Sequence, residues 1–130
     1  MKCLIADPSV TQRRAIRNIL QESGWEEIAE TPDGKQALEL CLTGGFDLLV
    51  TEWNLPGSTG IELVGALREN EATAKLPILM VTDRNGRQDV LDAVRAGVSA
   101  YLLKPFSAET LTGKIRQIVS PEGNEDKEAA

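Results

Sequence analysis

The sequence predicts a three-layer α/β fold, in which five helices cover a doubly wound parallel sheet of five strands. Five short apolar runs recur about every twenty to twenty-five residues, at positions 3–6, 28–30, 48–51, 78–82 and 100–103. The first, third and fourth runs are almost continuously hydrophobic, as expected for strands that are covered on both faces. Helix-like segments separate the runs, and such alternation with short links favours a parallel sheet with right-handed crossovers.

Each segment between the strands has apolar residues at i, i+3 or i+4, which predicts one buried stripe per helix. The five stripes are Ile16, Ile19 and Leu20; Leu38, Cys41 and Leu42; Ile61, Val64 and Leu67; Val90, Leu91 and Val94; and Leu111, Ile115 and Ile118.

Capping residues support these helix limits. Ser9 can begin the first helix and Gly24 can end it, whereas Asp33 and Gly34 open the second helix. Gly97 stands where a left-handed residue would end the fourth helix.

Composition indicates one globular domain over residues 1–119. Apolar residues make up 42% of the 130 positions and charged residues 26%, a balance typical of folded domains. Residues 120–130 are acidic and lack apolar periodicity, so we expect a disordered tail there. The net charge of −6 disfavours a nucleic-acid partner. No apolar run reaches membrane-spanning length and no signal peptide is evident, which predicts a cytoplasmic protein with no membrane partner.

The residue inventory excludes several classes of site. The chain has no histidine, which rules out Ser-His-Asp and Cys-His nucleophile sites. Its two cysteines, Cys3 and Cys41, are too few and too far apart for a zinc motif or a disulfide framework. Both lie among apolar neighbours, so we interpret them as buried thiols.

Polar residues stand where four of the apolar runs end. The first run is followed by Asp7, the third by Glu52 and the fifth by Lys104. The fourth run ends at Thr82 and is followed by Asp83. In open α/β sheets the functional crevice lies beyond the carboxyl ends of the strands. We therefore expect these side chains to converge on one site.

These residues, with the sequence Glu52-Trp53-Asn54-Leu55-Pro56-Gly57 and the run Lys104-Pro105-Phe106, resemble the receiver domain of bacterial response regulators. The resemblance covers residues 2 to about 119 and adds a moderately specific match at the opening of the second helix. It implies the flavodoxin-like, CheY-like fold with strand order 2-1-3-4-5.

The resemblance also implies roles for individual residues. Glu52 occupies the position of the aspartate that accepts a phosphoryl group in that family. A hydroxyl at Thr82 would bond the phosphoryl oxygens, and Lys104 would pair with their charge. Tyr101 would change burial with the switch, and the peptide bond before Pro105 would be cis.

Three departures from the family pattern fall on the phosphoryl chemistry. Glu52 is one methylene longer than aspartate, which displaces the carboxylate in a reaction that depends on positioning. Receivers hold Mg²⁺ near this residue, here through Asp7, Glu52 and Asn54, but Pro8 replaces an expected acidic ligand. Asp83 adds bulk and negative charge where the family has a small residue. We therefore expect weak or lost Mg²⁺ binding and loss of phosphorylation.

The predicted function is that of a single-domain atypical response regulator, not an enzyme, which signals through protein–protein contacts. Glu52 would act as a partial phosphomimic or would simply hold Lys104 in one conformation. The expected partners are a histidine kinase, a motor switch or another signalling protein. They would bind the face formed by residues 87–96, 99–103 and 108–119, with Tyr101, Arg95 and Lys114 exposed on it. We expect a monomer or a weak dimer.

Three alternatives remain at this stage. The first is a conventionally phosphorylated, Mg²⁺-dependent receiver. The second is a flavodoxin-like FMN protein, although the segment after the first strand makes a poor phosphate loop. The third is a nucleotide second-messenger binder that uses Arg13 and Arg14 or Arg84 and Arg87, residues that we otherwise interpret as surface ion-pair partners.

Overall fold

The computed structural model describes residues 1–119, in which five strands and five helices alternate. All neighbouring strands are parallel, in the order β2-β1-β3-β4-β5, so the predicted fold class and strand order are confirmed. The strands are β1 (Lys2–Ala6), β2 (Glu27–Thr31), β3 (Leu48–Thr51), β4 (Ile78–Thr82) and β5 (Ala100–Leu103). The helices are α1 (Val10–Glu22), α2 (Gly34–Gly44), α3 (Gly60–Glu69), α4 (Arg87–Ala96) and α5 (Ala108–Ile118).

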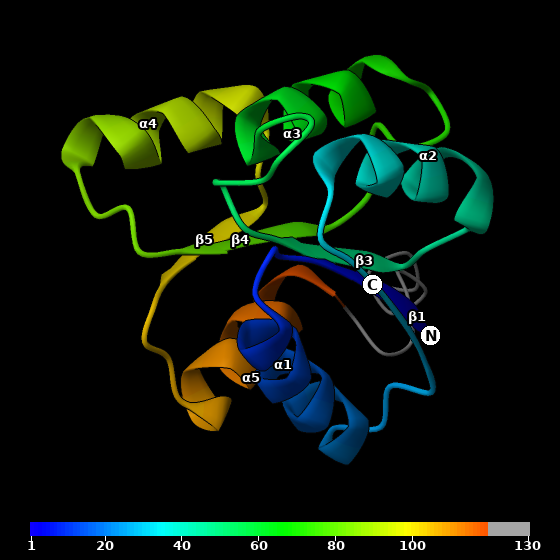
Figure 1. The fold of residues 1–130 in the computed structure, drawn as a ribbon, viewed down its shortest axis with the longest axis vertical. Coiled ribbons are helices and arrows are strands. Elements are labelled where there is room, and N and C mark those ends of the chain that lie inside the picture. Colours follow the sequence, from blue (N-terminus) through cyan, green and yellow to red (C-terminus); the bar gives the residue numbers. More distant parts are fainter. Residues whose placement is uncertain (120–130) are drawn as a thin grey trace, which may run out of the picture.

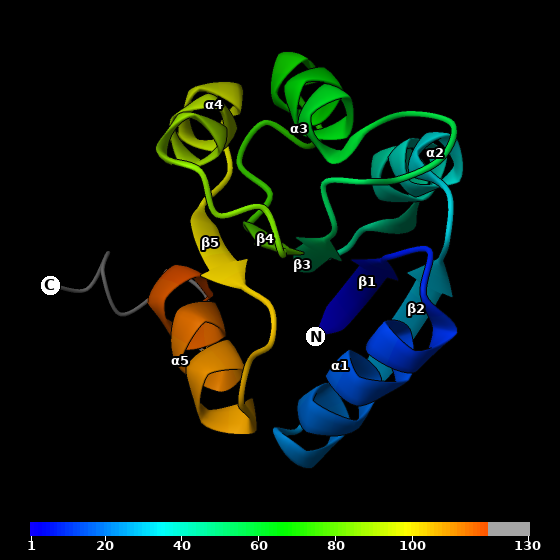
Figure 2. The ribbon, with the colours of Figure 1, turned by 60° about the vertical axis from the view of Figure 1, so that its left-hand side comes forward.

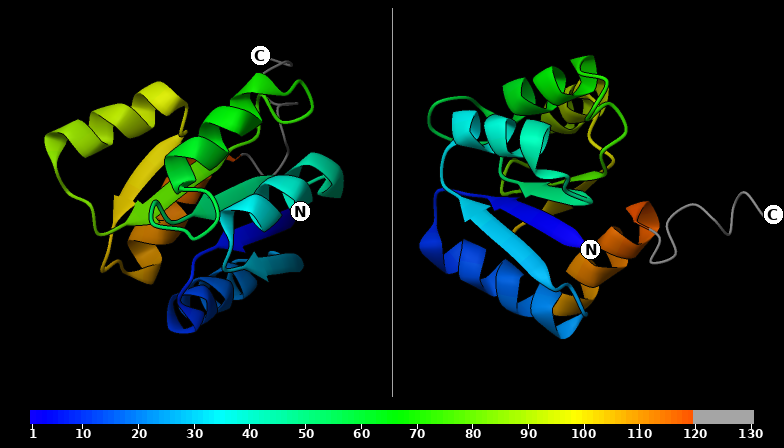
Figure 3. Two further views of the ribbon diagram at one scale, coloured as in Figure 1. Left: turned by 45° about the horizontal axis from the view of Figure 1, so that its top comes forward. Right: turned by 90° about the vertical axis from the view of Figure 1, so that its right-hand side faces the viewer.

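The helices form two layers around the sheet. Figure 1 shows α1 and α5 on one face and α2, α3 and α4 on the other. Figure 2 shows the two edge strands of the sheet, β2 in light blue and β5 in yellow. Helices α1 and α5 contact each other beneath the sheet (Figure 3). This is the three-layer arrangement that the alternating sequence pattern predicts.

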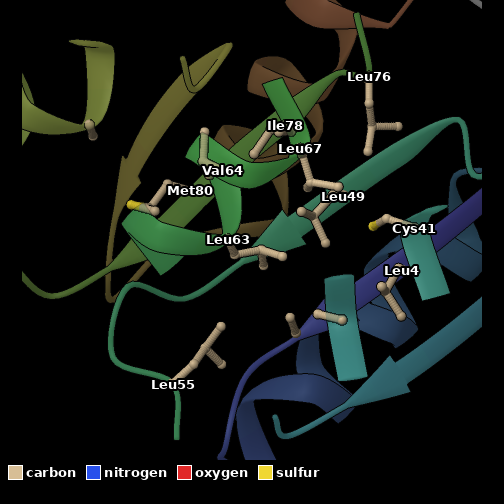
Figure 4. Close-up of a cluster of buried hydrophobic side chains, with 13 residues drawn as sticks. Leu4, Cys41, Leu49, Leu55, Leu63, Val64, Leu67, Leu76, Ile78 and Met80 are labelled. Carbon is tan, nitrogen blue, oxygen red and sulfur yellow. The ribbon is translucent and has the colours of Figure 1, made fainter. Parts of the chain in front are cut away.

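Each face of the sheet has its own hydrophobic core. Leu4, Leu49 and Met80 point into the core beneath α2, α3 and α4, which Figure 4 shows in close-up. The adjacent residues Ile5 and Val50 belong to the other core, under α1 and α5. Successive strand residues alternate between the two faces of the sheet. Because helices cover both faces, residues that point to either face are buried, which accounts for the unbroken apolar runs.

Local capping follows the sequence. The Ser9 hydroxyl accepts the Gln12 backbone N–H at the start of α1, and Asp33 accepts two backbone N–H groups at the start of α2. Gly97 ends α4 with φ +115°, and a Cβ there would lie 2.8 Å from the Arg68 side chain, so only glycine fits this turn.

The predicted apolar stripes of two helices are partly wrong. Leu91 is 42% and Val94 58% exposed on α4, where Ala93 is the buried residue. Helix α4 covers the edge strand β5 beside α3, so it has little sheet surface against which to bury a wide stripe. Leu42 on α2 is also exposed. Apolar periodicity identified these helices, but it did not determine how much of each stripe is covered.

No helix within residues 1–119 is long and apolar enough to cross a membrane. The acidic tail predicted for residues 120–130 lies outside the described residues.

Candidate functional site

Four strands deliver polar side chains to one end of the sheet. Pairing of Ala6 with Thr51 brings the next residues, Asp7 and Glu52, side by side beyond the ends of β1 and β3. Pairing of Thr82 with Leu103 places Lys104 just beyond β5. The backbone ladder continues through these residues, since the Glu52 N–H donates to the Ala6 carbonyl at 2.8 Å. Of the five residues predicted to converge, Asp7, Glu52 and Lys104 lie in direct contact.

Lys104 bridges the two carboxylates of this site. Its Nζ lies 2.8 Å from Asp7 Oδ2 and 2.8 Å from Glu52 Oε1. Asp7 is only 2% exposed and Glu52 only 6% exposed. Buried charges require partners, and the single ammonium group supplies one to both carboxylates.

Backbone N–H groups donate hydrogen bonds to the other two carboxylate oxygens. Asp7 Oδ1 accepts the Ser9 N–H at 2.8 Å. Glu52 Oε2 accepts the N–H groups of Trp53 at 2.6 Å and Asn54 at 3.1 Å. Each of the four carboxylate oxygens thus has a donor from within the chain, and Glu52 is folded back onto its own loop.

The pKa directions agree with this arrangement. Burial by itself raises the pKa of Glu52, but hydrogen bonds from Lys104, Thr82 and the Asn54 backbone outweigh it, so the pKa is lower than usual. Burial by itself lowers the pKa of Lys104, but its bonds to Asp7 and Glu52 raise it above the ordinary value. Both groups are therefore charged at neutral pH.

The loop after β3 closes tightly against Glu52. The Gly60 N–H donates to the Trp53 carbonyl at 2.7 Å, which brings the start of α3 onto the loop. A Cβ at residue 60 would lie 2.4 Å from the Glu52 carbonyl oxygen, so the close approach requires glycine. This glycine is a positioning residue that sequence reasoning missed, although its place directly after a helix cap could have drawn attention to it.

Two carboxylates and one lysine make up the possible metal-binding part of this site. Within residues 1–119 no group of three acidic or cysteine side chains is close enough to hold a metal ion. Of the predicted ligands, Asp7 and Glu52 lie together, but the exposed Asn54 side chain instead accepts a hydrogen bond from Arg84. Pro8 is exposed and has no side-chain oxygen. Mg²⁺ favours several oxygen ligands, whereas here an ammonium group lies between the two carboxylates.

The remaining predicted site residues have different surroundings. Thr82 is fully buried, and Asp83 is exposed without a hydrogen bond to any residue in the described part of the chain. Tyr101 is half-buried and its hydroxyl donates to the Arg84 carbonyl at 2.7 Å. The Lys104–Pro105 peptide bond is cis, as the family resemblance implied.

Two of the three residues predicted to be exposed on the outer face are not fully exposed. Arg95 is exposed, but Tyr101 and Lys114 are only partly accessible. Tyr101 is partly covered because its hydroxyl reaches inward to the β4–α4 loop. A sequence cannot reveal the direction of such a side chain.

Comparison with known proteins determines the family. The model of the response regulator receiver domain matches residues 3–116. The chain belongs to the response regulator receiver family. Receivers of this CheY-like type act in two-component signalling, where they interact with kinases and other signalling proteins and are generally not enzymes.

Similar receivers include two chemotaxis proteins. The chain is 47% identical over 118 residues to the chemotaxis protein CheY of Pseudomonas aeruginosa, covering 91% of this chain and 95% of that protein. It is 42% identical over 118 residues to the chemotaxis protein CheY-3 of Vibrio cholerae, covering 91% of both chains.

Solved structures agree on the fold. The chemotaxis response regulator CheY4 of Vibrio cholerae superposes with a TM-score of 0.85 at 30% identity, covering 91% of this receiver and 98% of that chain. A putative response regulator from Chloroflexus aurantiacus also gives a TM-score of 0.85, at 29% identity, covering 90% and 95% of the respective chains.

Proposed function

We propose that this receiver signals through protein–protein contacts without being phosphorylated, with Glu52 in the position of the phosphorylatable aspartate. The observation that supports this most directly is the state of the Glu52 carboxylate. One oxygen lies 2.8 Å from the Lys104 ammonium and the other accepts two backbone N–H groups. A nucleophile must present a free, aligned oxygen to the incoming phosphorus. Both carboxylate oxygens of Glu52 already accept hydrogen bonds from groups of the protein.

Weak Mg²⁺ binding is part of the same proposal. In phosphoryl transfer the metal ion neutralises charge that develops on the phosphoryl oxygens. Here Asp7 and Glu52 are neutralised by Lys104, and Pro8 adds no ligand. When bound, the ion would supply this charge stabilisation through Asp7 and Glu52, but it would first have to displace the ammonium group.

Glu52 would reproduce only part of the phosphorylated state. Driving a two-state switch from 1:99 to 99:1 requires about 5.5 kcal/mol of differential interaction. A carboxylate carries one charge, compared with nearly two for a phosphoryl group, and has one oxygen fewer for hydrogen bonding. The carboxylate–lysine pair also loses hydration on burial, which offsets much of the attraction. We therefore infer a partial bias toward the signalling conformation.

We further infer that partners bind the face formed by α4, β5 and α5. Leu91, Val94 and Leu103 leave large apolar side chains exposed there, between 42% and 58% accessible. Arg87 and Arg95 on α4 add exposed positive charge next to them. Exposed apolar side chains with a polar rim are typical of protein-binding surfaces. Because similar receivers are named chemotaxis proteins, a histidine kinase or a flagellar motor switch protein is the partner we would test first.

Incubation with acetyl phosphate and Mg²⁺, followed by intact-mass spectrometry, tests the phosphorylation-independent function. We expect no phosphoryl adduct on the wild-type protein. A Glu52→Asp variant should gain some labelling, and Glu52→Asp combined with Pro8→Asp should gain more because an acidic metal ligand is added. Glu39→Asp, on the exposed side of α2, is the matched control for introducing an aspartate elsewhere.

The contrary result is a stable phosphoryl adduct on wild type, mapped to Glu52 or Asp7. That result would establish the conventionally phosphorylated receiver instead. Titration of Trp53 fluorescence with Mg²⁺ in the same four proteins, each also carrying Trp25→Phe, gives a second readout, because Trp53 is adjacent to Glu52. Wild type should bind the ion more weakly than the doubly substituted variant.

A further inference from the structure

One arginine side chain from the loop after β4 packs against the loop after β3. The Arg84 guanidinium carbon lies 4.3 Å from the centroid of the Trp53 ring. Its Nη1 also donates to Asn54 Oδ1 at 3.3 Å. Trp53 and Asn54 are the two residues whose backbone N–H groups hold the Glu52 carboxylate. Arg84 therefore connects the β4–α4 loop to the segment that positions Glu52.

Arg84 is equally connected to the outer edge of the molecule. Its Nε lies 3.5 Å from Asp89 Oδ1, in the first turn of α4. Its backbone carbonyl accepts the Tyr101 hydroxyl from β5 at 2.7 Å. Arg84 thus contacts Asp89 through its side chain and Tyr101 through its backbone.

The Arg84 side chain is 39% exposed, but its Nε lies buried against the protein. Arg84 Nε is buried and, among residues 1–119, has no hydrogen-bond partner of good geometry. A solvated arginine would keep that nitrogen in water. A planar guanidinium group stacked on an indole ring retains a favourable interaction after losing part of its hydration.

We propose that Arg84 is a positioning residue that couples the Glu52 loop to the α4–β5 edge. We call Arg84, Trp53, Asn54 and Asp89 the Arg84 clasp. The clasp holds the β4–α4 loop over Glu52 and keeps Tyr101 half-buried, using only groups within the chain. The coupling deepens the proposed function, because it links the Glu52 end to the proposed partner face; the clasp itself is independent of phosphorylation.

The first test uses Trp53 as a local probe. The chain has two tryptophans, so a Trp25→Phe background makes Trp53 the only indole. In that background Arg84→Ala should raise acrylamide quenching of Trp53 fluorescence. Hydrogen exchange in residues 83–86 should accelerate about threefold, as expected for losing one partly exposed cation–π contact. Arg84→Lys keeps the charge and should restore only part of the protection.

The second test asks whether the effect reaches Tyr101. Because the chain has a single tyrosine, selective isotope labelling gives one set of ring resonances in nuclear magnetic resonance spectra. Arg84→Ala should shift or broaden these resonances. Arg87→Ala is the matched control, since Arg87 is exposed on the first turn of α4 and its side chain forms no hydrogen bond or ion pair within residues 1–119.

Unchanged quenching and exchange in Arg84→Ala would overturn the clasp, as would equal effects in Arg87→Ala. Altered Trp53 signals with unaltered Tyr101 resonances would overturn the coupling to the α4–β5 edge. None of these measurements involves phosphate. Phosphorylation of the wild-type protein would therefore contradict the proposed function but leave the clasp untouched.

Discussion

The end of the sheet that carries Glu52 and the edge formed by α4 and β5 are built in opposite ways. At the sheet end, Asp7, Glu52 and Thr82 are buried and satisfied within the chain. At the edge, β5 has no fully buried residue, and α4 buries only Ala93. The first region is fixed by pairing of buried charges, whereas the second leaves large apolar side chains exposed. This difference indicates that conformational change at the edge costs less than change at the carboxylate pair.

Removing the bridging ammonium should have the largest effect on this comparison. Lys104→Met leaves Asp7 and Glu52 buried without a cation, and breaking a buried ion pair costs about 3–5 kcal/mol of unfolding free energy. Urea unfolding at neutral pH measures the loss. Because the two carboxylates then repel each other, the variant should regain stability relative to wild type as the pH falls.

Lys75→Met, at an exposed position, is the control and should stay within about 0.5 kcal/mol of wild type. In wild type the pKa of Lys104 is raised, so its stabilising contribution is complete below pH 10.5 and is lost as pH rises through the folded pKa. A Lys104→Met variant as stable as wild type at neutral pH would mean that the ammonium contributes nothing net.

The next largest effect should come from neutralising Glu52. Glu52→Gln replaces a carboxylate that accepts hydrogen bonds from Lys104 and from two backbone N–H groups, and hydrogen bonds to charged groups contribute about 1.5–3 kcal/mol. The folded pKa of Glu52 is lowered, so its contribution is complete above pH 4.5 and disappears as pH falls through the folded pKa. Unfolding free energies of wild type and variant should therefore converge in acid.

Glu39→Gln on the exposed side of α2 provides the comparison for the charge change alone. A stability difference that stays constant from neutral to acid pH would show that the Glu52 charge is not what stabilises the fold.

A smaller effect is expected at the junction of the two regions. Tyr101→Phe removes one hydrogen bond, from the phenol to the Arg84 carbonyl, which should cost about 1 kcal/mol. Burial and the nearby Asp89 carboxylate raise the pKa of the Tyr101 phenol. Its stabilising contribution therefore holds below pH 10 and is lost as pH rises through the folded pKa. Absorbance titration of this single tyrosine checks the direction, and an unshifted titration would place the phenol in solvent.

The smallest effect should come from the α4 surface itself. Leu91→Ser and Val94→Ser replace exposed side chains and should change the unfolding free energy by no more than about 0.5 kcal/mol. Leu63→Ala on the neighbouring α3 is the contrast, because Leu63 is fully buried and its truncation should cost about 2–5 kcal/mol. Similar losses at Leu91 and Leu63 would mean that the α4 face is covered.

The sequence by itself determined the order of strands and helices, the caps at Ser9 and Asp33, and the strand-end positions of Asp7, Glu52, Thr82 and Lys104. These features depend on local periodicity and on the rule that parallel strands end at one edge. The sheet order followed from family resemblance rather than from local pattern.

Only the tertiary structure decided which groups meet across long sequence separations. Lys104 contacts Asp7 from 97 positions away, and Arg84 packs on Trp53, because the sheet register and loop paths bring them together. The same packing decides that Leu91 and Val94 face outward although their spacing matches a buried stripe. Spacing along a helix depends on its own geometry, but burial and pairing depend on what the rest of the chain places against it.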